Sequence, residues 1–124
     1  RARRILTAWD RRRAAAWAAS DAVAVRALYL SGSPLARRET SALRRWQERG
    51  LRLRGLHAQI VRLQVRSLSG TRLRAVLVTR TSGATRVMRG GRVVGGLPDD
   101  APRRLRVELR RVDGVWVMAR SEAA

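Results

Sequence analysis

Residues 33–66, SPLARRETSALRRWQERGLRLRGLHAQIVRLQVR, contain the change of pattern that decides the fold. Up to Gly50, apolar residues recur at the spacing of an α-helix, with Leu35, Leu43 and Trp46 on one side. From His57 onward they alternate with other residues at the period of a β-strand. The change near residue 50 therefore predicts a helical half followed by a half made of strands.

Three helices are predicted before this change. Apolar spacing indicates a first helix over residues 3–19. Asp21 is a candidate N-cap for a short second helix, whose apolar face is formed by Val25, Leu28 and Tyr29. Ser33 is a candidate N-cap for the third helix, and Gly50 stands where a left-handed residue ends a helix.

An antiparallel meander of strands is predicted over residues 51–121. Residues 73–81 are apolar on both phases, which indicates a central strand, and residues 97–102 read as a connecting loop. Leu105, Val107 and Leu109 are expected to face a core. Asp113-Gly114 between valines is a hairpin signal. Helices followed by hairpin-linked strands predict an α+β fold with one curved antiparallel sheet, its core including Trp9, Leu28, Leu43, Trp46, Val76 and Val107.

Length and composition limit the class of protein. A chain of 124 residues with 45% hydrophobic residues predicts one globular domain over residues 1–124. The chain has no cysteine and one histidine, His57, so disulfides, thiolate metal sites and multi-histidine metal sites are excluded, and we expect no metal or cofactor. Because the chain starts at Arg1, we expect a removed signal or anchor and favour an extracytoplasmic over a cytoplasmic location.

The charge is strongly positive, because 28 basic residues, all arginine, face nine acidic ones, for a formal net charge of +19. Such a field attracts an acidic protein, an anionic membrane surface or nucleic acid. Adjacent arginines diverge on helices and strands, so the clusters are predicted to surround their elements without forming a stripe. Any binding to nucleic acid or lipid should be unspecific and weakened by salt. The candidate contact residues are Arg11, Arg12, Arg37, Arg44, Arg104, Arg106 and Arg110.

The chain resembles the NTF2-like superfamily of cone-shaped domains, particularly small members from high-GC bacteria. The resemblance rests on the Trp9 helix, on Leu28-Tyr29 followed by Gly-Ser-Pro, and on the Asp113-Gly114 hairpin. It implies a cavity between the concave face of the sheet and the helices, in which related isomerases place a carboxylate or histidine as base. The candidate cavity residues are Tyr29, His57, Gln59 and Trp116.

Three functions remain open at this point. We expect no carboxylate beside His57, hence a neutral imidazole, no acid–base turnover and little effect of His57→Gln. The first interpretation is thus a non-catalytic module that binds a small molecule or serves in assembly, and that forms a homodimer through the sheet at residues 73–81. The alternatives are a SnoaL-like isomerase, cyclase or dehydratase, and a non-specific binder of anionic polymers such as nucleic acid.

Overall fold

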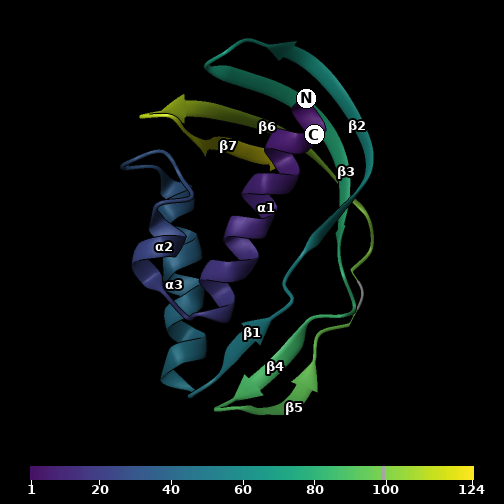
Figure 1. The fold of residues 1–124 in the computed structure, drawn as a ribbon. Coiled ribbons are helices and arrows are strands. Elements are labelled where there is room, and N and C mark those ends of the chain that lie inside the picture. The colour runs from purple at the N-terminus through teal and green to yellow at the C-terminus, as the bar shows by residue number, and fades with distance from the viewer. Residues whose placement is uncertain (99) are drawn as a thin grey trace.

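The first half of the chain is helical in the computed structural model, which describes residues 1–98 and 100–124 (Figure 1). The helices are α1 (Ala2–Ala18), α2 (Ala22–Arg26) and α3 (Pro34–Glu48). The predicted caps are confirmed: the Asp21 carboxylate accepts from the N–H of Ala24 at 3.1 Å, and the Ser33 hydroxyl from that of Ala36 at 3.2 Å. None of the helices described combines the length and apolar character needed to cross a membrane.

The second half forms a main sheet of four antiparallel strands in the order β2-β3-β6-β7, which curves around α1 (Figure 1). These strands are β2 (Ala58–Leu68), β3 (Arg72–Thr81), β6 (Arg103–Val112) and β7 (Val115–Ala123). The α+β fold with helices on a curved antiparallel sheet is confirmed. Part of the predicted loop, Asp99, lies outside the described residues.

A smaller sheet that the sequence did not predict lies beyond the end of the main one (Figure 1). Its strands pair in the order β1-β4-β5, with β1 (Arg52–Arg54), β4 (Arg86–Arg89) and β5 (Arg92–Gly96). Gly90-Gly91 forms the turn between β4 and β5, one of the two possibilities that the sequence left open.

The core lies between the helices and the concave face of the main sheet. Leu73 and Leu109, opposite each other on β3 and β6, have no exposed surface, and Leu28 and Leu43 are nearly as buried. Val76 and Val107 are buried as predicted. Trp9 and Trp46 are only partly buried and pack against the core, so their predicted full burial was wrong. Each ring has a polar or charged contact instead: Trp9 Nε1 donates to the Leu28 carbonyl, and the Arg49 guanidinium lies 5.4 Å from the Trp46 ring.

The segment around Tyr29 is not helical as predicted: Ala27 and Leu28 form a turn, and Tyr29 forms a single β-bridge to Met118. α2 ends at Arg26, and the chain then runs beside β7. The N–H of Met118 donates to the Leu28 carbonyl at 2.8 Å, and the N–H of Leu30 donates to the Met118 carbonyl at 2.9 Å. Pairing with a distant strand thus replaces the last helical turn and fixes the position of Tyr29.

Two bulges in β2 overturn the predicted phase of its side chains. The register with β3 shifts between Ile60 and Arg62 and again between Val65 and Ser67. Each extra residue moves the following side chains to the other face of the sheet. Ala58 and Ile60 pair with Thr81 and Thr79 on the concave side.

Candidate functional site

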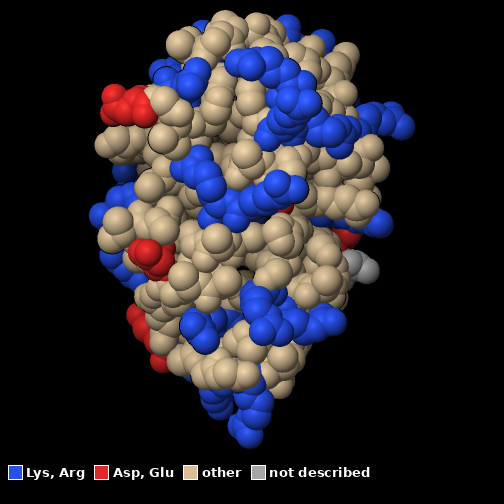
Figure 2. All heavy atoms as spheres, viewed as in Figure 1, with Lys and Arg blue, Asp and Glu red and all other residues tan. Residues whose placement is uncertain are grey.

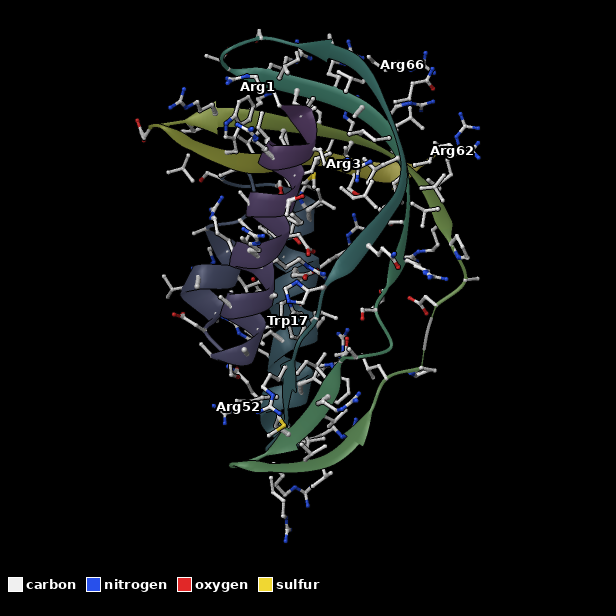
Figure 3. All side chains as sticks on the ribbon, turned by 45° about the vertical axis from the view of Figure 1, so that its right-hand side comes forward. Arg1, Arg3, Trp17, Arg52, Arg62 and Arg66 are labelled. Atoms are coloured by element: carbon white, nitrogen blue, oxygen red, sulfur yellow. The ribbon has the colours of Figure 1, made fainter. Side chains whose placement is uncertain are left out.

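A cavity of about 460 Å³ lies between α1, α3, the Tyr29 segment and the concave face of the main sheet. We call it the cone cavity. Its polar groups include the hydroxyls of Tyr29, Thr79 and Thr81, with Arg3 and Arg103 also in its wall. Figure 3 shows Arg3 near the start of α1, on the side that faces the sheet. The apolar wall is formed mainly by Leu6, Trp9, Leu35, Ile60, Leu77, Leu105, Val107 and Met118.

An ion pair joins α1 to α3 in the wall of the cone cavity. Arg13 Nε lies 2.8 Å from Glu39 Oε1, and Trp17 Nε1 donates to the same oxygen at 2.9 Å. The side chains of Arg13 and Glu39 are 23% and 19% exposed. Burial alone would lower the pKa of Arg13, but the charge of Glu39 outweighs it and raises that pKa. The Arg13 guanidinium therefore stays charged.

Tyr29 brings a neutral hydroxyl to this wall. Burial, reinforced by the negative charge of Glu39, raises the pKa of the Tyr29 phenol well above its usual range. Its ring packs edge-on against Trp9, with 5.8 Å between the ring centroids. At neutral pH the phenol thus stays protonated and cannot act as a charged base.

A carboxylate does reach His57, so the expectation that none would is wrong. Asp10 Oδ2 lies 3.2 Å from His57 Nδ1, and Asp10 Oδ1 accepts from the N–H of Ala58 at 3.1 Å. Asp10 lines the cone cavity with a side chain that is 16% exposed, whereas that of His57 is 51% exposed. A proton donated from Nδ1 to Asp10 leaves Nε2 as an acceptor, which is the arrangement of a general base.

The structure separates the four residues that the sequence placed in the cavity. Tyr29 and Gln59 contribute to its wall, and His57 and Trp116 are not among its lining residues. Gln59 nevertheless turns its Oε1 to Arg80 Nε, at 3.1 Å, because the β2 bulge reverses the predicted phase. Trp116 packs against the core from β7.

Sequence reasoning missed Asp10, Arg13 and Glu39. A signal for the first two was available, because Asp10, Arg13 and Trp17 are three and four residues apart and so share one face of a helix. Among the described residues, no group of three or more His, Asp or Glu side chains could hold a metal ion.

The arginines that the sequence singled out have different surroundings. Arg12 Nη1 donates to the Trp116 carbonyl at 2.6 Å, and burial lowers the pKa of Arg12, so this residue helps to tie α1 to β7. Arg37 Nη1 donates to the Gly32 carbonyl at 3.3 Å. Arg11 and Arg44 are exposed on α1 and α3. Arg104, Arg106 and Arg110 lie on β6, and Figure 2 shows basic side chains spread over the visible face of the molecule.

On the main sheet, arginines from different clusters share one side, although the adjacent arginines of a cluster diverge. We call the side of the sheet turned away from the helices the outer face. Alternate residues of one strand share a face, and the register brings such residues of β3 beside those of β6. Arg72 thus pairs with Arg110, and Arg74 with Glu108. Arginines adjacent in the sequence point to opposite faces of the sheet, as expected. Alternate arginines of neighbouring strands lie on the same face.

Glu108 is the buried acid of this outer face, with 6% of its surface exposed. Its two oxygens accept from Arg72 Nη2 and Arg110 Nε, each at 2.9 Å. The hydrogen bond from Arg72, assisted by that from Arg110, lowers the pKa of Glu108 despite its burial. Glu108 is therefore ionised and already neutralised by two arginines.

No protein-family model matches this chain, and no curated protein matches it. Solved structures do resemble it. The intermembrane space region of the chloroplast protein ARC6 has a TM-score of 0.59 at 15% identity, over 98% of this chain and 92% of that one. Aln2 from a Streptomyces species has a TM-score of 0.60 at 15% identity, over 97% and 87% of the two chains.

A third similar structure, from Xanthomonas campestris, is described as a calcium/calmodulin dependent protein kinase II association domain. Its TM-score is 0.54 at 16% identity, over 100% of this chain and 88% of that one. These neighbours have NTF2-like cone folds, so the cone predicted from the sequence is confirmed as the fold. At such low identity the likeness concerns the fold alone.

Proposed function

We propose that this protein binds a small, largely apolar molecule in the cone cavity. The observation that carries the proposal is the cavity of about 460 Å³ with its long apolar wall and a few polar groups. Ligand pockets usually have this character and a volume of roughly 300–1,000 Å³. NTF2-like neighbours support a ligand-binding module in general terms.

The polar groups of the wall suggest what the ligand carries. Glu39 is occupied by Arg13 and Trp17, and Asp10 by His57 and the Ala58 N–H. The hydroxyls of Thr79 and Thr81 in the same wall are left to contact a ligand. A molecule with an apolar body and one neutral oxygen function, such as a ketone or alcohol, would match these partners.

Filling the cavity should weaken the binding of a neutral apolar probe. N-phenyl-naphthylamine is suitable, because an anionic dye would also be drawn to the outer-face arginines. Thr79→Phe should weaken its binding by at least about tenfold, or ~1.4 kcal/mol, because the ring would occupy the cavity. The measurement is a fluorescence titration of the dye.

Val78→Phe is the matched control, because Val78 neighbours Thr79 on β3 but points to the outer face. Its dye affinity should remain within about threefold of the wild type. Equal losses in the two variants, or a wild type that leaves the dye unbound, would refute the cavity as the binding site.

Acid–base chemistry at the rim of the cavity is a second candidate, favoured specifically by the contact between Asp10 and His57. Asp10 orients the ring and can stabilise the imidazolium that forms when Nε2 accepts a proton. Related enzymes of the SnoaL-like type carry out isomerisation, cyclisation or dehydration, reactions that need such a base. In this proposal His57 is the base and Asp10 is the positioning residue.

Proton abstraction from nitrobenzisoxazole tests this second candidate, since a base removes the carbon-bound proton while the N–O bond breaks to give a cyanophenolate. His57→Gln should lower the rate at least about a hundredfold, the range of general-base contributions. Asp10→Asn should lower it less, because the ring loses the carboxylate that orients it but keeps its own nitrogen as base. A rate that both variants leave unchanged would exclude this chemistry.

A further inference from the structure

We infer that the outer face of the main sheet binds the phosphate backbone of a nucleic-acid strand. The site is a groove of about 370 Å³ in this face, on the opposite side of the sheet from the cone cavity. Each of the four strands contributes one arginine to the groove: Arg66, Arg74, Arg106 and Arg120. We call it the arginine groove. It is independent of the proposed ligand site.

The positive charge of the arginine groove is not cancelled within the described residues. Glu108 lies in the groove, but Arg72 and Arg110 already hold its oxygens. Arg74 Nε is 3.8 Å from Glu108, and Arg106 Nη1 is 4.0 Å from an exposed Glu122. Contacts this long and exposed contribute little.

Two arginines of the groove have no ion pair among the residues that the structure describes. These are Arg66 on β2 and Arg120 on β7. Figure 3 shows Arg66 and its neighbour Arg62 pointing outward from β2, away from the helices. Their guanidinium groups are therefore available to an external anion.

The spacing of these side chains suits an anion with regularly repeated charges. Arg74 and Arg120 lie opposite Glu108 from either side, and Arg106 is two residues along β6, so neighbouring groove arginines are separated by roughly 7–10 Å. A guanidinium group matches a phosphate with two parallel hydrogen bonds. A phosphodiester chain that crosses the strands can thus contact several arginines at once, and its affinity then depends on salt.

Sequence-specific reading of bases is not expected on this surface. The tryptophans and the single tyrosine all belong to the core or pack against it, so none is available to stack on bases from the outer face. The same lack argues against an acidic protein, whose interface would need aromatic anchors. It also argues against a membrane, because a convex face lined mainly by arginines touches a flat bilayer poorly.

The test compares two variants that lose the same number of charges. One carries Arg→Gln at the four groove positions. The control carries Arg→Gln at Arg11, Arg38, Arg44 and Arg45, which are exposed on α1 and α3. Binding of a fluorescein-labelled oligothymidylate of about 20 nucleotides is measured by anisotropy between about 50 and 200 mM salt. Circular dichroism melts establish that each variant is folded.

The slope of log affinity against log salt concentration should be steeper for the wild type than for the groove variant. The expected difference is about 2.8, or 0.7 for each of four phosphates. The groove variant should bind at least about tenfold more weakly, and the control within about threefold of the wild type. If the groove variant does not fold, Arg66→Gln and Arg120→Gln alone should each reduce the slope by about 0.7.

Several results would overturn the inference. Equal losses in the two quadruple variants would mean that net charge acts without a site. Binding to phosphatidylserine vesicles but not to the oligonucleotide would identify a membrane as the partner. A dimer that the groove variant dissociates, without oligonucleotide binding, would identify a second copy as the occupant.

Discussion

Replacement of Glu39 by alanine is expected to lower the free energy of unfolding by about 3 kcal/mol. The substitution removes the oxygen that holds both Arg13 Nε and Trp17 Nε1, and leaves a largely buried guanidinium without its counter-charge. A buried charge that loses its partner costs more than the pair contributed. Urea denaturation at neutral pH measures the change.

Glu48→Ala is the control for this prediction, because Glu48 is exposed near the end of the same helix and has no ion pair within the described residues. It should change stability by no more than about 0.5 kcal/mol. Glu39→Gln, which keeps an acceptor oxygen, should fall between the two. A loss in Glu39→Ala as small as that in Glu48→Ala would mean that the wall of the cone cavity does not depend on this ion pair.

Leu109→Ala is expected to destabilise the protein by about 2–5 kcal/mol. Leu109 has no exposed surface and lies between Leu73 on β3 and Met118 on β7, so truncation leaves a void at the centre of the main sheet. The rigid interior around it can collapse only partly into such a void. Thermal and urea unfolding of the variant give the magnitude.

Val112→Ala removes a comparable side chain from the end of the same strand, where 43% of its surface is exposed. We expect a loss of about 0.5 kcal/mol or less for this control. If the two variants unfold at the same urea concentration, the packing between the helices and the sheet does not dominate the stability of the cone.

Local signals in the sequence predicted the helix ends and the hairpin turn, because these depend only on residues close by in the chain. Asp21 and Ser33 bond to N–H groups three residues ahead, and Gly50 adopts a φ of +70° at the end of α3. Asp113 and Gly114 have φ values of +51° and +77°, as a two-residue hairpin turn requires. Such signals act within a few residues and can therefore be recognised without knowledge of the rest of the chain.

The phase of β2 could not be predicted in this way. Alternation continued from His57 would have pointed Gln59 and Val61 into the cone, but Val61 is 52% exposed. The bulges that change the phase exist because β2 must pair with β3 while it curves around α1. Pairing with a partner strand is a long-range condition that a single-strand pattern does not contain.

By itself the sequence determined that three helices precede the strands of the main sheet, the Asp113-Gly114 turn and the strong positive charge, because periodicity, capping residues and composition express these directly. Only the tertiary structure decided which charged groups meet. Asp10 and His57 are 47 residues apart, and Arg13 and Glu39 are 26 apart. The arginine groove likewise draws on four separate strands. Such contacts depend on how helices and strands pack and on the register between strands, which bring together side chains that no local pattern relates.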